Sequence, residues 1–196
     1  MIKRYNFMKS KLRLILKPFL IISLLFALQG CFSVKPGKTG NGKKLYETFY
    51  AGEEGNQYFI KPFELTDLAR NEKSLWDFSF RSKVSLQGES RVNFSLFTQL
   101  ALHKIEKVSF SNKNTNFSNE QVSFMFIEKT KEGFLSRFTL NTDTENLKAL
   151  FSDANWEITI KTEQGNYTYT PDKAVIKKIN TLDQTLFALF YKQSDK

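Results

Sequence analysis

The sequence is short of the residues on which many enzyme and metal sites depend. Its 196 residues include one cysteine, Cys31, and one histidine, His103. A single cysteine excludes an intramolecular disulfide, and this pair of residues cannot supply a zinc or copper ligand set, so we expect no metal and no cofactor. A Ser-His-Asp triad would have to use His103, but no G-x-S-x-G motif accompanies it. We expect His103 to be solvated or held in the core.

Carboxylates are present but form no recognisable catalytic pattern. Glu53-Glu54 lies between two glycines, which is typical of a solvated turn. Asp143-Thr144-Glu145 is typical of a helix start. A glycosidase needs only two carboxylates at the right separation in space, so a hydrolase stays open as a less favoured alternative. We expect a protein that is not an enzyme.

The N-terminal region has a different pattern from the rest. Six basic residues and no acidic residue precede Cys31, and the apolar run from Phe19 to Leu28 is too short to span a bilayer comfortably. The run ends in Leu28-Gln29-Gly30-Cys31, which resembles the lipobox of bacterial lipoproteins. The resemblance implies cleavage between Gly30 and Cys31 and a diacyl or triacyl chain on Cys31. An ordinary signal peptide or an uncleaved anchor is the alternative.

The formal charge of +9 gives a misleading impression of a basic protein. Six of the 29 Lys and Arg residues precede Cys31, which leaves 23 against 20 acidic residues in the rest of the chain. These charges are interspersed, so we expect no nucleic-acid partner. The segment from Gly37 to Lys44 nearly matches a phosphate-binding loop. Lys44 stands where that motif has its Ser or Thr, so we expect no nucleotide either.

The lipoprotein resemblance also implies a location in the cell envelope. Phe32 and Ser33 follow the cysteine, so the position directly after Cys31 is Phe32 and lacks the aspartate that keeps many lipoproteins in the inner membrane. This implies the outer membrane, with the protein facing the periplasm. Two or more acyl chains hold a protein stably on a membrane, since each buried CH₂ contributes about 0.8 kcal/mol. The membrane, through the acylated cysteine, and an envelope protein are the expected partners.

We expect three segments: a signal peptide over 1–30, a lipidated and flexible tether over 31–44, and one β-rich domain over 45–196. Alternating apolar and polar residues through the domain predict strands with one buried face. Pro62 is expected to make its strand an edge or to end it early. The alternating apolar residues are Trp76, Phe78 and Phe80; Val92, Phe94 and Leu96; Val108 and Phe110; Val122, Phe124 and Phe126; Trp156, Ile158 and Ile160; and Tyr167 and Tyr169.

Two helices are expected within this series of strands. Thr142 or Asp143 is predicted to cap a short helix that ends at Phe151, and Pro171 to open a longer C-terminal helix. The longer helix has apolar residues at the spacing of one helical face: Val175, Ile179, Leu182, Leu186 and Phe190. Thr181 is a point where this helix could break, with 186–191 as a last strand instead.

These patterns predict a mainly β protein, an antiparallel β-sandwich or curled sheet with a short helix and a C-terminal packing helix. An open or closed barrel with an apolar interior is the alternative. We expect a non-catalytic accessory or scaffold subunit of an envelope assembly. A lipid-, glycan- or peptide-binding module is the alternative, with Tyr58-Phe59 or Tyr167 and Tyr169 as an outward aromatic platform.

Overall fold

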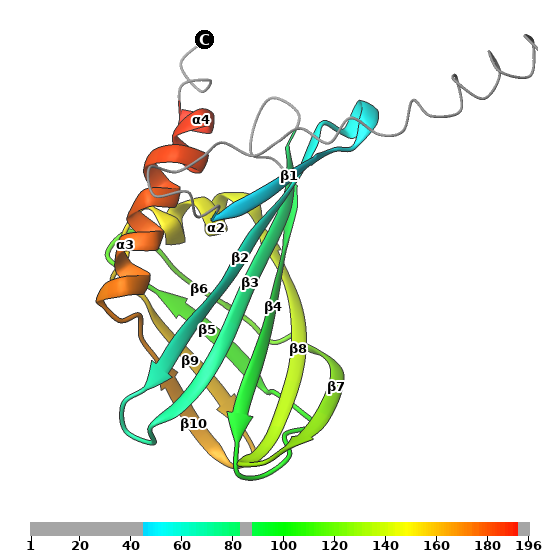
Figure 1. Ribbon diagram of the computed structural model, residues 1–196, viewed down its shortest axis with the longest axis vertical. Helices are drawn as coiled ribbons and strands as arrows, with labels where there is room; N and C mark the ends of the chain where they lie inside the picture. Colours follow the sequence, from blue (N-terminus) through cyan, green and yellow to red (C-terminus); the bar gives the residue numbers. More distant parts are fainter. Residues whose placement is uncertain (1–44, 83–87, 192–196) are drawn as a thin grey trace, which may run out of the picture. The chain divides into compact units, whose positions relative to one another are not determined.

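The computed structural model describes residues 45–82 and 88–191. The predicted signal peptide, the cleavage site at Gly30 and Cys31, and the tether lie outside the described residues. Two antiparallel sheets and a C-terminal helix make up the described part (Figure 1). The prediction of a mainly β sandwich with a packing helix is therefore confirmed.

The larger sheet has six strands in the order β1-β2-β3-β4-β8-β7, so β1 and β7 are its edges. The alternating sequence places one row of side chains on the inner face of each strand and the next row on the outer face. The strands are β1 (Tyr46–Tyr50), β2 (Asn56–Asp67), β3 (Glu72–Ser82), β4 (Glu89–Thr98), β7 (Ser123–Thr130) and β8 (Gly133–Asp143).

The smaller sheet lies behind the larger one and has four strands in the order β10-β9-β5-β6. A pair of backbone hydrogen bonds between Thr66 and Thr170 connects β2 to the residue that follows β10. The two sheets are thus joined directly along one side. The strands are β5 (Lys107–Ser111), β6 (Asn116–Asn119), β9 (Glu157–Thr162) and β10 (Gly165–Tyr169).

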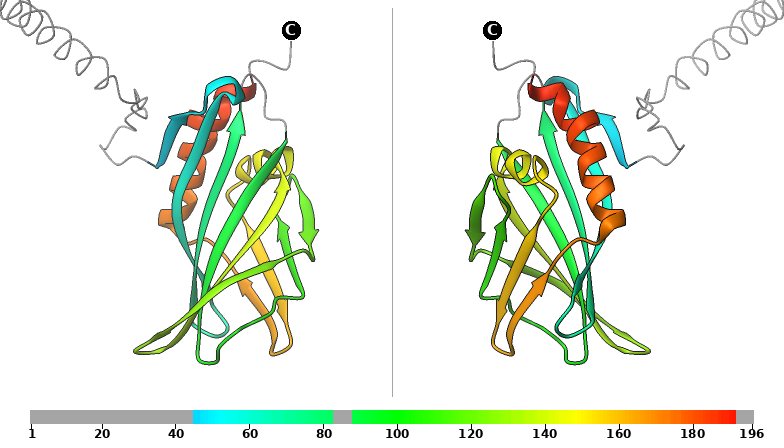
Figure 2. Two further views of the ribbon diagram at one scale, coloured as in Figure 1. Left: turned by 90° about the vertical axis from the view of Figure 1, so that its right-hand side faces the viewer. Right: turned by 90° about the vertical axis from the view of Figure 1, so that its left-hand side faces the viewer.

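The helices pack at one end of the sandwich, as the side views show (Figure 2). Phe151 contacts Phe78 edge to face, with ring centroids 5.4 Å apart, and Phe187 stacks on Phe80 at 5.7 Å. The segments that carry Phe151 and Phe187 therefore cover the inner face of the larger sheet at that end. The helical segments are α2 (Thr144–Phe151), α3 (Lys173–Leu182), the π-helical segment η2 (Asp183–Phe187) and α4 (Ala188–Tyr191), and a 3₁₀ turn, η1 (Gly52–Glu54), links β1 to β2.

Aromatic rings fill the space between the two sheets. Trp76 is fully buried; it stacks on Phe94 at 4.5 Å and meets Phe110 of the smaller sheet edge to face at 5.7 Å. Trp156 is also buried, and its indole N–H donates to the Leu150 carbonyl at 2.7 Å. Both tryptophans therefore belong to the core, as the alternation predicts.

Tyr167 and Tyr169 are buried too, so the alternative of an outward platform built from these two residues is wrong. Their rings lie parallel, with centroids 6.4 Å apart, on the inner side of β10. Of the other proposed pair, Tyr58 is buried, whereas Phe59 is 45% exposed. Only Phe59 thus remains available for a ligand.

Contrary to the prediction, Pro62 does not end its strand, and β2 lies between β1 and β3 rather than at the edge of the sheet. β2 continues through it to Asp67, and its pairing register with β3 shifts between Ile60 and Phe63. β1 pairs with β2 only as far as Ile60, so the missing N–H of Pro62 falls where neither neighbour needs a ladder hydrogen bond. A bulge therefore accommodates the proline inside a long strand.

The helix starts also differ in detail from the prediction. Asp143 occupies the N-cap position of α2 but makes no side-chain capping bond there. Pro171 does not open the C-terminal helix: α3 begins at Lys173, and Asp172 caps it by accepting from the Val175 N–H at 2.8 Å. Thr181 stays helical, with its hydroxyl donating to the Lys177 carbonyl, so the alternative of a last strand over 186–191 is wrong.

Candidate functional site

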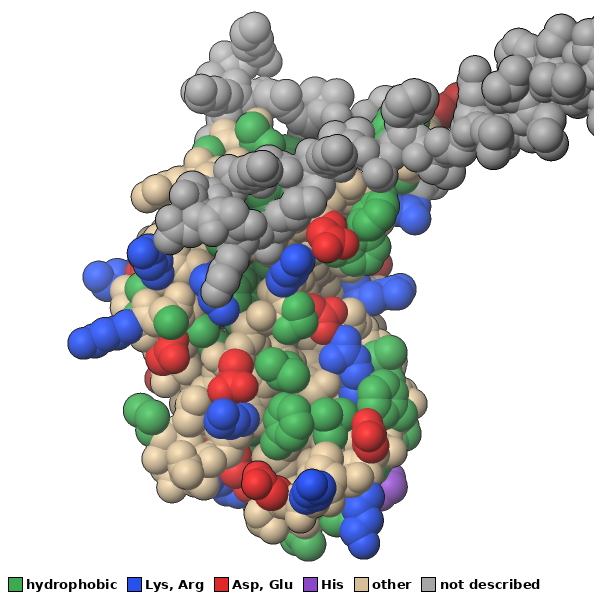
Figure 3. All heavy atoms as spheres, in the orientation of Figure 1, with side chains coloured by type: hydrophobic (Ala, Val, Ile, Leu, Met, Phe, Trp, Pro, Cys, Tyr) green, Lys and Arg blue, Asp and Glu red, His purple; other side chains and the backbone are tan. Residues whose placement is uncertain are grey.

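The strongest departure from the predicted pattern is in β7, at the edge of the larger sheet. Alternation predicts that Val122, Phe124 and Phe126 share a buried face, but no residue of β7 is buried. Phe124, Met125 and Phe126 are 45%, 48% and 44% exposed. We call these three residues the β7 edge. Figure 3, in the orientation of Figure 1, shows hydrophobic side chains along the right-hand side of the domain, where β7 lies.

A β-bulge explains why the prediction fails. The register with β8 shifts between Phe124 and Phe126, so that Phe124 stands across from Phe138 and Phe126 from Arg137. Phe138 points into the core and Arg137 points outward, so the two phenylalanines lie on opposite faces of the sheet. The β7 edge therefore offers apolar surface on both sides of one strand.

His103 lies beside this edge. It is exposed in the segment between β4 and β5, and its ring centroid is 5.9 Å from that of Phe124. Leu100 of the same segment is 63% exposed. His103 thus adds to the rim of an exposed aromatic surface.

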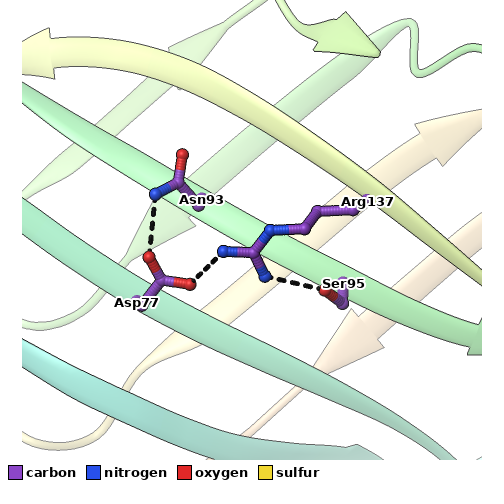
Figure 4. Close-up of polar contacts among 4 residues, drawn as sticks. All are labelled: Asp77, Asn93, Ser95 and Arg137. Carbon is purple, nitrogen blue, oxygen red and sulfur yellow. Dashed lines mark hydrogen bonds and ion pairs between the residues drawn. The ribbon is translucent and has the colours of Figure 1, made fainter. Parts of the chain in front are cut away.

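A polar network crosses the outer face of the larger sheet at its centre (Figure 4). Asp77 of β3 accepts from the Arg137 guanidinium at 2.6 Å and from the Asn93 amide at 2.8 Å. Arg137 also donates to Ser95 Oγ at 2.9 Å. Both charged side chains are about four-fifths covered. The network joins β3, β4 and β8 and leaves little of either charge for a ligand.

A second cluster of charged groups lies at the turn between β2 and β3. Burial raises the pKa of the Glu72 carboxyl, and its Oε2 atom has no hydrogen-bond partner within the described part of the chain. Burial likewise raises the pKa of Tyr169, whose hydroxyl is also without a partner there. Glu72 lines a cleft of about 450 Å³ with Glu64, Lys73 and Glu132. This is the place in the described residues where acid–base chemistry is best supported.

The geometry of that cleft argues against a two-carboxylate mechanism. Glu64 is held by Lys73, whose ammonium lies 2.8 Å from its carboxylate. Nearby Asp67 is buried, and its two oxygens accept from three backbone N–H groups. Asp67 is therefore a structural group rather than a second catalytic carboxylate.

Two adjoining polar clefts, of about 660 and 520 Å³, lie at the end of the larger sheet near the β3–β4 hairpin, and β6 of the smaller sheet also lines the larger cleft through Phe117, Ser118 and Asn119. They share three lining residues: Glu89, Arg91 and Asn141. Sequence reasoning missed them because their residues come from different strands and match no motif.

Neither metal-site geometry nor similarity assigns an activity. In residues 45–82 and 88–191, no group of three or more His, Cys, Asp and Glu side chains is placed to hold a metal ion. No helix within these ranges is long and apolar enough to cross a membrane. The chain matches no known protein-family model and no curated protein.

Proposed function

We propose that this protein is a lipid-anchored, non-catalytic accessory or scaffold subunit of the bacterial cell envelope, which binds a protein partner at the β7 edge. The exposure of Phe124, Met125 and Phe126 is the observation that carries the proposal. Exposed edge strands are templates for pairing, and proteins commonly protect them with charges or cover them. In β7, the three apolar residues of the β7 edge are left uncovered.

The partner that fits this edge is an extended strand of another protein. Among the described strands β7 pairs only with β8, so its other side can accept backbone hydrogen bonds. Phe124 and Phe126 lie on opposite faces of the sheet. Side chains on one face of an added strand would therefore contact Phe124, and side chains on its other face would contact Phe126. Alternate side chains of that strand would then bury both rings.

The anchor rests on the sequence between Leu28 and Cys31. Acylation of Cys31 would hold the domain at the outer membrane, on the periplasmic side. A membrane-held domain meets other envelope proteins at high effective concentration, which permits a small docking surface. This arrangement suits an accessory subunit better than a freely diffusing binder.

Site-specific photo-crosslinking in living cells tests both parts of the proposal. A photoreactive phenylalanine analogue replaces Phe126 in one strain and Phe49 in another. Phe49 is a matched control, since it is 45% exposed and lies on β1, the opposite edge of the same sheet. Each variant is also made with Cys31→Ser.

We expect one discrete crosslinked product with a second protein at position 126, none at position 49, and loss of the product in the Cys31→Ser background. Equal products at both positions, or none at 126, would contradict docking at the β7 edge. A product at 126 that survives Cys31→Ser unchanged would contradict the need for the anchor.

Glu72 supports a second candidate function, a hydrolase with Glu72 as general acid. A carboxyl whose pKa is raised by burial, as that of Glu72 is, suits that role. The Lys73 ion pair with Glu64 and the structural bonds of Asp67 make this candidate the weaker one. A deletion strain rescued by wild type but not by folded, correctly located Glu72→Gln would favour the hydrolase.

A further inference from the structure

The two polar clefts of the larger sheet form one groove with an ordered floor. Phe59, Ser79, Arg91 and Asn141 stand across from one another on β2, β3, β4 and β8. Neighbouring strands lie about 4.8 Å apart, so this row extends for about 15 Å. Each of the four residues lines one or both clefts. We call this surface the polar groove.

The groove has hydrogen-bonding groups that are already oriented. The side-chain amide of Asn141 donates to Glu89 Oε2 at 3.2 Å, and the side-chain amide of Asn119 donates to the backbone carbonyl of Asn141 at 2.6 Å. These bonds leave the side-chain oxygen of Asn141 and the second oxygen of Glu89 as acceptors. Arg91 is exposed and has no partner among the described residues, so it supplies donors next to them.

One further acceptor lies unused in the wall of the groove. Thr139 Oγ1 is buried and finds no hydrogen-bond partner within the described ranges. A buried hydroxyl without a partner is costly, and a ligand or an ordered water that reached it would remove that cost. The groove therefore offers donors and acceptors side by side.

The charges indicate which ligand suits this surface. Arg81 and Arg91 are balanced by Glu89 and Asp143 along the same groove. Such a surface has no excess positive charge to hold a phosphate or a sulfate. A ligand rich in hydroxyl groups fits better, because each hydroxyl both donates and accepts.

Phe59 adds an apolar contact at one end of the row. Its ring is 45% exposed and lines the smaller of the two clefts. Sites for small polar ligands commonly combine an aromatic wall with a few convergent polar groups. The exposed ring can pack against the C–H face of a sugar, while the polar groups bind its hydroxyls.

We propose that the polar groove binds a neutral glycan, with Phe59 contacting a sugar ring and Glu89, Arg91 and Asn141 binding its hydroxyl groups. This site is separate from the β7 edge, since Phe124, Met125 and Phe126 do not line it. A failure of either proposal therefore leaves the other standing.

Isothermal titration calorimetry on the full chain in detergent micelles tests the proposal. The probes are a β-1,4-linked N-acetylglucosamine tetrasaccharide, a β-1,4-linked glucose tetrasaccharide and a sulfated tetrasaccharide. The variants are Arg91→Ala and Phe59→Ala, with Lys178→Ala as control because Lys178 is exposed on α3, outside both clefts. Thermal unfolding confirms that each variant is folded.

We expect at least one neutral tetrasaccharide to bind, Arg91→Ala to weaken it about tenfold or more, and Lys178→Ala to leave it unchanged. Phe59→Ala should also weaken binding. Absence of binding by both neutral probes, or binding that Arg91→Ala does not change, would overturn the proposal. Preference for the sulfated probe, lost at high salt, would show an anion site instead.

Discussion

The buried carboxylate of Asp67 accepts a hydrogen bond from the backbone N–H of Thr168 at 3.0 Å, and so connects the two sheets. Its other oxygen accepts from the N–H groups of Ala69 and Arg70, which shapes the turn after β2. One side chain thus fixes both a local turn and a contact between residues 101 positions apart.

Asp67→Ala should therefore destabilise the domain strongly. The substitution leaves three N–H groups without their acceptor, and a buried unsatisfied group costs roughly 1–3 kcal/mol, so we expect a loss of about 3 kcal/mol. Urea unfolding of the full chain in micelles measures it. Asp143→Ala is the control, because Asp143 is exposed and makes no capping bond; it should change stability by less than about 0.5 kcal/mol. Similar losses in the two variants would contradict the role given to Asp67.

Glu72 should make stability fall as pH rises. Burial holds its pKa above the ordinary value of 4.5, so the folded state keeps a proton that the unfolded chain has already lost. The free energy of unfolding should therefore decrease as pH increases from about 4.5 through the higher folded-state pKa. Glu72→Gln should remove that decrease, whereas Glu163→Gln, in the exposed turn between β9 and β10, should not. An unchanged pH profile in Glu72→Gln would refute this assignment.

Trp156→Ala should cost about 3–5 kcal/mol, because it removes a buried ring from the aromatic core and leaves the Leu150 carbonyl without its donor. Chemical denaturation followed by circular dichroism gives the value. Phe59→Ala, a half-exposed position, should cost much less. A small effect at Trp156 would show that the core is packed differently.

His103→Ala should leave stability nearly unchanged, since the side chain is exposed and contacts one ring at the surface. Under the proposed scaffold role, the variant should also rescue a deletion strain as well as wild type does. A folded, correctly located variant that fails to rescue would favour catalysis instead.

Alternation alone was enough to predict the inner faces of β3, β4, β5 and β9, because each of those strands is paired on both sides and contains no bulge of its own. It failed at Phe124 and Phe126, where a bulge breaks the period and no second neighbour covers the strand. Which strand is an edge depends on pairing across the whole sheet, and the local sequence does not encode it.

The polar sites were beyond sequence reasoning for a related reason. Asp77 and Arg137 are 60 positions apart, and nothing in their local sequence distinguishes them from other surface charges. The groove residues Glu89, Arg91 and Asn141 meet only because β4 pairs with β8. Such sites follow from the strand order, which a single sequence does not reveal.

The lipid anchor is the claim on which the envelope role depends, and mass spectrometry of the mature N-terminal peptide tests it most directly. Cells that express the full chain should yield a protein that begins at Cys31, with a mass increased by two or three acyl chains. Cys31→Ser should abolish this modification and release the domain from the membrane. A chain that keeps Met1, or an unmodified Cys31, would contradict the account.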